Sequence, residues 1–187
     1  AMNKVISKEI FKKNNIKTTK YFTINQNNYN KFEIKNLIKK NKIKFPVVVK
    51  PNNEGSSIGV KICKNLFDLN KSAKFLIKKY FDLIFEEFIG GQEIQVAVIN
   101  GLPLGAIELE PKRQFYDYKA KYSKAAKTKH IMPANLKSSS YKEVLQIAKK
   151  AHNSLGCRGI TRSDFKFFEN KFYILEVNTQ PGMTSLS

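Results

Sequence analysis

The chain has 187 residues, enough to bury one large core or two small ones, and its 42% hydrophobic content and mean hydropathy of −0.40 are typical of soluble globular proteins. No apolar run reaches the roughly 20 residues that cross a bilayer, and residues 1–15 lack the apolar centre of a signal peptide. The formal net charge of +19 suggests polyanionic partners such as nucleic acid or an anionic membrane.

The kind of basic residue argues against a nucleic-acid groove. Of the 34 basic residues 31 are lysine, and only Arg113, Arg158 and Arg162 are arginine, whose fork matches guanine and phosphate. The lysines are spread along the whole chain, so solvated lysine faces are the better interpretation. Cys63 and Cys157 are far apart and lack metal-ligand spacing, which predicts buried thiols in a reducing cytoplasm.

Helices and short strands are predicted to alternate at the start of the chain. Residues 4–14 place Val5, Ile6, Ile10 and Phe11 on one helical stripe. A short strand over 21–24 and a helix over 29–40 follow.

A strand with a lysine near its end is predicted over residues 45–51, FPVVVKP. Lys50 either extends its amine to the surface or binds an anion. The loop at 52–60, NNEGSSIGV, contains two glycines and two serines, whose backbone N–H groups and hydroxyls suit phosphate oxygens. An ordinary hairpin turn is the alternative, but the preceding lysine favours a flap over a triphosphate.

The middle of the chain predicts strands over 83–85, 93–100 and 102–110, after a helix over 66–79 that packs on the sheet through its apolar residues: Phe67, Leu69, Ala73, Leu76 and Ile77. The acids that follow residue 85 either hold an adenine and a ribose or are simply exposed. Residues 111–134 show no periodicity and are basic and tyrosine-rich, which indicates a functional lid or a surface that stacks on single-stranded nucleic acid. A helix stripe follows over 141–155.

The last thirty residues predict a β-hairpin that carries a magnesium site. Residues 161–167 and 171–177 form the strands, and Glu169-Asn170 forms the turn. Three oxygen ligands suited to Mg²⁺ lie on these strands, together with the fixed cation of Arg162: Asp164, Glu176 and Asn178. The alternative is an ordinary hairpin with solvated acids. The break at Pro181-Gly182 leaves backbone N–H groups for a ligand.

Four segments together resemble the D-alanine–D-alanine ligase family of the ATP-grasp superfamily. They are FPVVVKPNNEGSSIGV (45–60), FEEFIGGQEIQVAVI (85–99), FYDYKAKY (115–122), and LGCRGITRSDF with ILEVNTQPGMTSLS (155–187). The resemblance implies an α+β fold of the ATP-grasp type, in which two α+β subdomains hold the nucleotide between them. Residues 1–88 would be the central subdomain and 89–187 the C-terminal subdomain. The family's N-terminal domain and C-terminal helix are expected to be missing, so the chain is expected to be a fragment.

The resemblance implies ATP-dependent joining of two D-alanine molecules for peptidoglycan synthesis in the cytoplasm. The first carboxylate would take the γ-phosphate to give an acyl phosphate, and the amine of the second D-alanine would displace phosphate. The implied cofactors are ATP and two Mg²⁺ ions, with Mn²⁺ as a substitute. A homodimer of the full-length enzyme is expected, with no nucleic-acid or membrane partner.

The resemblance also assigns roles to single residues. Lys4, Lys50 and Lys121 would bind phosphates, Ser56 and Ser57 belong to the flap, and Glu93 would bind the ribose. Glu86, Glu87, Phe88 and Ile89 would line the adenine, although Glu87 stands where several relatives carry lysine. Asp164, Glu176 and Asn178 would hold the metal ions. Arg162 and Gly182 would stabilise the tetrahedral intermediate, Ser56 and Tyr122 would tie the flap to the mobile loop, and Ser187 would contact the second D-alanine.

Three hypotheses therefore stand. The first is the D-alanine–D-alanine ligase, with a D-lactate ligase as a variant that Tyr122 disfavours. The second is another ATP-grasp carboxylate–amine ligase, which the segment 115–122 disfavours. The third is a basic nucleic-acid-binding module, whose affinity would fall steeply with salt.

Overall fold

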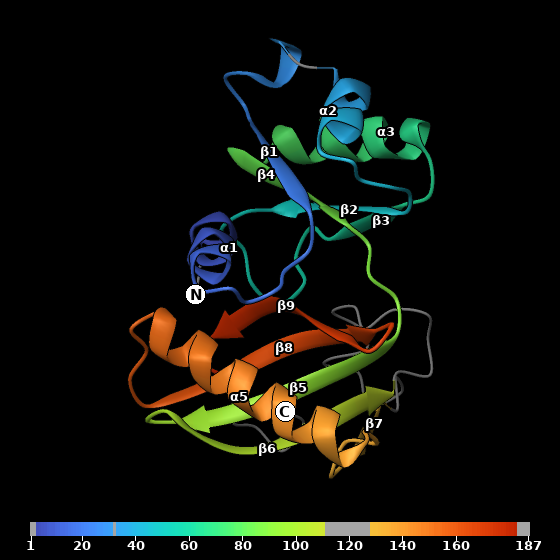
Figure 1. Ribbon diagram of the computed structural model, residues 1–187. Coiled ribbons are helices and arrows are strands. Elements are labelled where there is room, and N and C mark those ends of the chain that lie inside the picture. Colours follow the sequence, from blue (N-terminus) through green and yellow to red (C-terminus); the bar gives the residue numbers. More distant parts are fainter. Residues whose placement is uncertain (1–2, 32, 111–127, 183–187) are drawn as a thin grey trace. The chain divides into compact units, whose positions relative to one another are not determined.

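The computed structural model describes residues 3–31, 33–110 and 128–182 (Figure 1). Its contacts divide the chain into two units. The small unit comprises residues 3–5 and 19–88, and the large unit comprises residues 6–18 and the described residues from 89 on. Among the described helices, none combines the length and the apolar character needed to span a membrane.

The small unit is an antiparallel sheet with the strand order β1-β4-β2-β3. Its elements are β1 (Tyr21–Asn25), the 3-10 helix η1 (Tyr29–Lys31), α2 (Ile34–Lys40), β2 (Val47–Pro51), β3 (Lys61–Cys63), α3 (Leu66–Ile77) and β4 (Asp82–Glu87). Helices α2 and α3 lie on the same side of this sheet (Figure 1). Val47 and Val49 are fully buried under them, and period-2 alternation therefore sends Lys50 to the opposite face.

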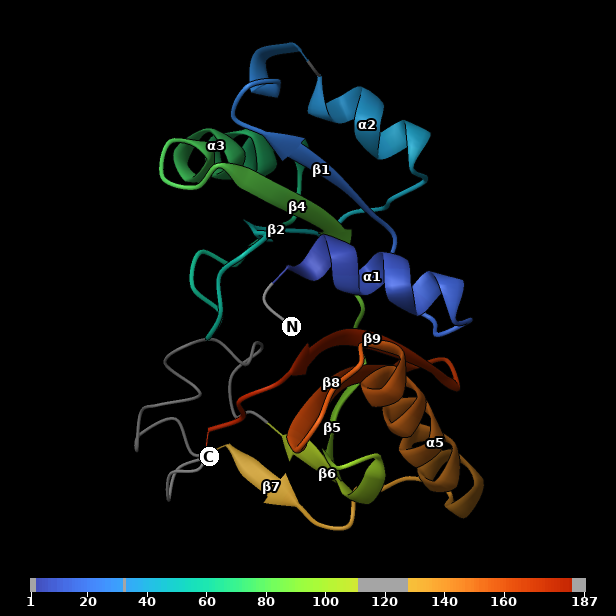
Figure 2. The ribbon, with the colours of Figure 1, turned by 90° about the vertical axis from the view of Figure 1, so that its left-hand side faces the viewer.

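The large unit is a second antiparallel sheet, with the strand order β7-β6-β5-β8-β9. Its elements are β5 (Gln92–Ile99), β6 (Leu102–Glu110), β7 (Lys129–Ile131), α5 (Ser138–Ser154), β8 (Ile160–Phe168) and β9 (Lys171–Asn178). Helix α5 runs along one face (Figure 2), where Val144 and Ala148 join Ile94, Phe165 and Ile174 in a single buried cluster. Most of helix α1 (Lys4–Lys13) also belongs to this unit.

The first helix is where the predicted stripe is wrong. Ile6 is 59% exposed, whereas Lys8 and Phe11 have no exposed surface and Ser7 is buried. The buried face of this helix is therefore largely polar. It is stabilised by hydrogen bonds: the Nζ of Lys8 donates to the Oγ1 of Thr18 at 2.6 Å. The periodicity of apolar residues in the sequence does not identify a buried helix face that is made largely of polar residues.

Two further expectations need correction. The loop predicted over 111–134 contains strand β7, which pairs with Glu108–Glu110 of β6. Phe67, placed on the core stripe of the helix at 66–79, is 76% exposed. Asn65 caps the N-terminus of that helix: its side chain accepts a hydrogen bond from the backbone N–H of Asp68 at 2.9 Å, which stabilises the first turn.

The predicted terminal hairpin is confirmed. Strands β8 and β9 pair antiparallel, with Arg162 opposite Asn178 and Asp164 opposite Glu176. The turn residues Glu169 and Asn170 have φ angles of 50° and 56°, the left-handed conformation that tight two-residue hairpins require.

Both cysteines are free thiols. Cys63 is buried, and its Sγ lies 3.6 Å from the hydroxyl of Ser72, while Cys157 is half-buried. Burial raises the pKa of each thiol, so both remain protonated at neutral pH. They act as small apolar side chains rather than as nucleophiles.

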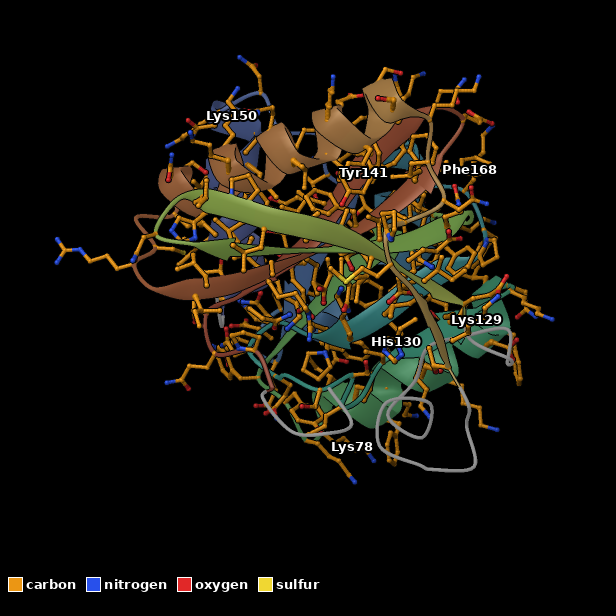
Figure 3. All side chains as sticks on the ribbon, turned by 90° about the horizontal axis from the view of Figure 1, so that it is seen from below. Lys78, Lys129, His130, Tyr141, Lys150 and Phe168 are labelled. Atoms are coloured by element: carbon orange, nitrogen blue, oxygen red, sulfur yellow. The ribbon has the colours of Figure 1, made fainter. Side chains whose placement is uncertain are left out.

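Lysine side chains on separate elements carry much of the charge. Lys78 at the end of α3, Lys129 on β7 and Lys150 on α5 are all exposed (Figure 3). Their exposure agrees with solvated lysine faces.

Gly91 generates a stability prediction. It has a φ of +80°, and a Cβ added there would lie 2.2 Å from the backbone oxygen of Phe167. Gly91→Ala is expected to lower the free energy of unfolding by about 2 kcal/mol or more, because left-handed backbone and a backbone clash both oppose it. Urea denaturation measures the effect. Gly90→Ala is the matched control, since nothing lies within 4 Å of its added Cβ; equal losses in both variants would contradict the clash.

Candidate functional site

The face of the large sheet opposite α5 carries five of the polar residues singled out in the sequence: Glu93, Arg162, Asp164, Glu176 and Asn178. We call it the polar face of the large unit and define it by cross-strand register. Its residues are Glu93 and Gln95 on β5, Arg162, Asp164 and Lys166 on β8, and Glu176 and Asn178 on β9. Paired residues of neighbouring strands point to the same side of a sheet, so these side chains share one surface.

Asp164 is the centre of this face. Its side chain is 8% exposed, and Arg162 donates two hydrogen bonds to it, from Nε to Oδ1 at 2.7 Å and from Nη2 to Oδ2 at 3.0 Å. The Nδ2 of Asn178 donates to Oδ2 at 3.1 Å. A nearly buried carboxylate is costly without partners, and the bidentate guanidinium supplies both charge and geometry. The predicted grouping of Arg162, Asp164 and Asn178 is therefore observed.

A β-bulge in β9 places Glu176 on the polar face of the large unit. The register passes from Asp164 opposite Glu176 to Phe165 opposite Ile174, which leaves Leu175 as an extra residue in β9. Ile174 and Val177, three residues apart, consequently both lie in the core beneath α5. Glu176 then shares the polar face with Asn178, whereas an unbroken period of two would put it on the core face beside Ile174.

These residues fit a magnesium site by their chemistry. Among the described residues no three His, Cys, Asp or Glu side chains cluster as metal ligands. The predicted set has two carboxylates, Asp164 and Glu176, and takes an amide oxygen as its third donor. Asn178 provides it, because half a turn of its amide replaces Nδ2 with an oxygen facing Asp164. Asp164 contributes two carboxylate oxygens to this set. Carboxylate and amide oxygens are the donors that Mg²⁺ selects.

Glu93 is held in place by a residue that the sequence analysis did not single out. The Nζ of Lys166 lies 3.1 Å from Glu93 Oε2, and both side chains are largely buried. Lys166 follows Asp164 by two positions and so stands on the same face, which is the signal that could have found it. Gln95, opposite Asp164 and only 7% exposed, was missed in the same way.

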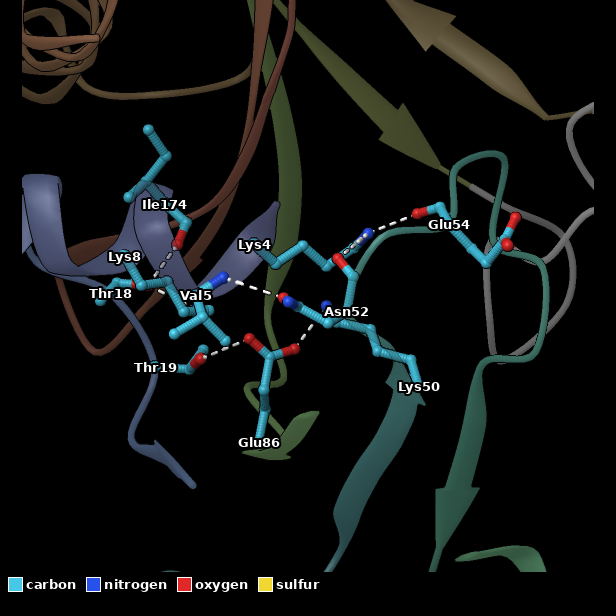
Figure 4. Close-up of polar contacts among 10 residues, drawn as sticks. All are labelled: Lys4, Val5, Lys8, Thr18, Thr19, Lys50, Asn52, Glu54, Glu86 and Ile174. Carbon is cyan, nitrogen blue, oxygen red and sulfur yellow. Dashed lines mark hydrogen bonds and ion pairs between the residues drawn. The ribbon is translucent and has the colours of Figure 1, made fainter. Parts of the chain in front are cut away.

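In the small unit, Lys50 and Glu86 form a buried ion pair on the sheet face opposite α2 and α3 (Figure 4). The side chains are 13% and 4% exposed, and the hydroxyl of Thr19 donates to the other carboxylate oxygen of Glu86 at 3.2 Å. The structure therefore places Lys50 inside, as an anion-paired amine, rather than extended to solvent. Glu86, expected near the adenine, is the partner of this lysine.

Lys4 is tied to the loop after β2. Its Nζ donates to the backbone oxygens of Asn52, at 3.4 Å, and of Glu54 (Figure 4). The backbone N–H of Val5 donates to the Asn52 side chain at 3.0 Å. Lys4, only 7% exposed, thus fixes the start of the glycine- and serine-containing loop.

The loop itself is open to solvent. Gly55 and Ser56 are exposed, and Ser56 and Ser57 adopt left-handed φ angles of 51° and 60°. The strand that leads to the predicted adenine residues ends at Glu87, whose backbone N–H donates to the oxygen of Lys20. The backbone N–H of Phe88 donates to Pro46, whereas Ile89 has no hydrogen-bond partner within the described part of the chain.

Three predicted residues lie outside the described ranges: Lys121, Tyr122 and Ser187. Gly182 is described and exposed.

The chain is similar to known proteins in sequence and in fold. The family model described as the D-Ala–D-Ala ligase C-terminus matches residues 10–187. A D-alanine–D-alanine ligase of Pelagibacter ubique is 57% identical over the whole chain, which spans 60% of that relative.

Two solved structures are similar in fold. The D-alanine–D-alanine ligase of Bacillus anthracis complexed with ATP has a TM-score of 0.80 and 27% identity, with 100% of this chain and 57% of that one covered. The VanG D-Ala:D-Ser ligase of Enterococcus faecalis has a TM-score of 0.85 and 27% identity, with 100% and 54% covered. The α+β architecture is thus the expected ATP-grasp type. The chain belongs to the D-Ala–D-Ala ligase family and matches the model of its C-terminal part.

Proposed function

We propose that this chain binds ATP with magnesium and carries the nucleotide-handling part of a D-alanine–D-alanine ligase. One observation carries the proposal: Arg162, Asp164, Glu176 and Asn178 share one sheet face, with the bulge at Leu175 placing Glu176 there. The ligase names of the relatives and the ATP in one similar structure support it. The chain covers under two thirds of these relatives, so the activity of the whole protein is part of the proposal.

The small unit is assigned the phosphates. Lys50 has a buried amine paired with the carboxylate of Glu86, and a compact ammonium suits a triphosphate oxygen as a point charge. Lys4 fixes the stem of the loop that carries Ser56 and Ser57, whose hydroxyls and backbone N–H groups would bind phosphate oxygens. The open backbone N–H of Ile89 is assigned to the adenine, with Glu87 and Phe88 beside it.

The large unit is assigned the metal ions and the reacting groups. Asp164, Glu176 and Asn178 would hold Mg²⁺ or Mn²⁺, which offsets charge between phosphate groups during phosphoryl transfer. Glu93 would accept hydrogen bonds from the ribose hydroxyls, and the ion pair with Lys166 holds its carboxylate in place. Arg162 and the backbone N–H of Gly182 would stabilise the negative charge of the tetrahedral intermediate.

The remaining assignments concern the substrates and the whole protein. Lys121 would bind phosphate, Tyr122 would close on Ser56, and Ser187 would hold the carboxylate of the second D-alanine. Residues 1–88 and 89–187 are proposed as the two ATP-grasp subdomains. We further propose a cytoplasmic homodimer that makes D-alanyl-D-alanine for the cell wall.

Magnesium-dependent nucleotide binding is the first test. Calorimetric titration with ADP at about 0.15 M salt is expected to show binding that Mg²⁺ strengthens. Glu176→Gln is expected to remove this strengthening, at least about tenfold in affinity, because a neutral amide oxygen replaces a charged ligand. Glu169→Gln, an exposed acid in the turn of the same hairpin, is the control and should bind normally. Equal magnesium dependence in both variants would refute the metal assignment.

Lys50 gives a second prediction. Lys50→Met is expected to weaken ADP affinity about 10- to 100-fold, the loss of a charge-assisted hydrogen bond, and to destabilise the fold by leaving Glu86 buried without this partner. Adding Glu86→Gln should restore stability but not affinity. Titration and thermal unfolding separate the two effects. Lys64→Met removes an exposed lysine of the same unit and should leave ADP affinity unchanged; an equal loss there would indicate diffuse attraction.

Ligation is tested in a chimera. This chain replaces the matching segment of the Pelagibacter ubique ligase, to which it is 57% identical. The chimera is expected to release phosphate from ATP and form D-alanyl-D-alanine, with D-alanine preferred over D-serine and D-lactate as the second substrate. Mass spectrometry identifies the product. A folded chimera that binds ATP but prefers D-lactate or D-serine would overturn the dipeptide assignment while leaving the nucleotide site standing.

A further inference from the structure

Lys8 is a charged side chain for which the proposed reaction gives no role. It lies in α1 within the large unit and has no exposed surface. Its Nζ donates to Thr18 Oγ1 at 2.6 Å, and the hydroxyl of Thr18 donates to the backbone oxygen of Ile174 at 2.9 Å (Figure 4). Burying an ammonium costs free energy, so the hydrogen bonds of Lys8 have to offset that cost.

The chain of hydrogen bonds ends at the residue next to the bulge. Ile174 is the last regularly paired residue of β9 before the unpaired Leu175, and Glu176 follows directly. Both backbone groups of Ile174 are held from the outer edge of the strand. Its N–H donates to the oxygen of Lys17 at 2.9 Å, and its oxygen accepts from Thr18. Residues 17 and 18 thus clamp β9 where the β8–β9 ladder is interrupted.

At the bulge the hydrogen-bond ladder between β8 and β9 is interrupted and no longer fixes the register of β9. Contacts from residues 17 and 18 fix it there instead. Shifting β9 by one residue would exchange its two faces and return Glu176 to the core side. The ammonium of Lys8 polarises the hydroxyl of Thr18, which makes that hydroxyl a stronger donor to Ile174.

We infer that Lys8 and Thr18 are positioning residues for the metal ligand Glu176: a buried ammonium and a hydroxyl hold the β9 bulge in register. The inference rests on the proposed function. The alternative is that the hydrogen bonds of Lys8 and Thr18 contribute to stability alone. The two differ in what happens at Glu176 when the hydroxyl is removed.

Thr18→Val separates them, because it keeps the shape of the side chain and removes both hydrogen bonds. The affinity of the chain for ADP in the presence of Mg²⁺, measured by calorimetry, is expected to fall about tenfold, as it does when supports of metal ligands are lost. Amide hydrogen exchange over residues 175–177 is expected to accelerate. Thr18→Ser retains the hydroxyl and should keep the affinity within about twofold of the unaltered chain.

The matched control is Thr161→Val. Thr161 is a fully buried threonine on the α5 face, with its hydroxyl 2.8 Å from Nδ1 of His152, whereas Thr18 is half-buried. It should lower the unfolding midpoint without changing either the magnesium-supported affinity or the exchange over 175–177. The double variant Lys8→Met/Thr18→Val avoids leaving the ammonium short of a partner, so it should fold and still show the affinity loss.

The outcomes are distinct. Thr18→Val and Thr161→Val with equal loss of stability and unchanged affinity would overturn the positioning role and leave the proposed function intact. An unaltered chain that binds ADP without any magnesium dependence would overturn the proposed metal site, and the positioning role with it. Full affinity in the double variant would also count against the inference.

Discussion

The extra residue in β9 is the constraint on which the candidate site depends. A strand of strict period two cannot place Phe172, Ile174 and Val177 beneath α5 and also give Glu176 to the opposite face. Inserting Leu175 solves the conflict, because it shifts the phase of the strand by one residue between Ile174 and Glu176. The core and the polar face are therefore coupled: the residues that hold the strand against α5 also decide where the carboxylate points.

In both units the two faces of the sheet differ in the same way. One face of each sheet is covered by its own helices and carries the apolar core, and the other face carries paired charges. Lys50 with Glu86, Lys166 with Glu93 and Arg162 with Asp164 are all largely buried ion pairs. Such pairs contribute little net stability, since desolvation offsets their attraction. Their value lies in holding charged groups in fixed positions before a ligand arrives, which is what nucleotide binding requires.

The sequence predicts the parts of the fold that local rules govern. The terminal hairpin, its Glu169-Asn170 turn and the grouping of Arg162, Asp164 and Asn178 follow from alternation and turn chemistry, and the structure confirms them. The bulge does not follow, because alternation alone assigns Glu176 and Ile174 to one face. The inward side of α1 does not follow either: Lys8 is buried because Thr18 and Ile174 meet it, and both are distant in sequence.

The wrong prediction of the buried face of α1 and the confirmed prediction of the hairpin have the same physical explanation. Apolar periodicity identifies a buried face only where burial is apolar, as it is for Val47 and Val49. Where a unit buries charge instead, as at Lys4, Lys8, Lys50 and Glu86, the pattern in the sequence looks like a solvated surface. Buried charge is tolerated only with partners, and partners are set by tertiary structure. The positions at which hydrophobic patterning fails here are thus the positions with hydrogen-bonded, ion-paired groups, which is where a binding site is built.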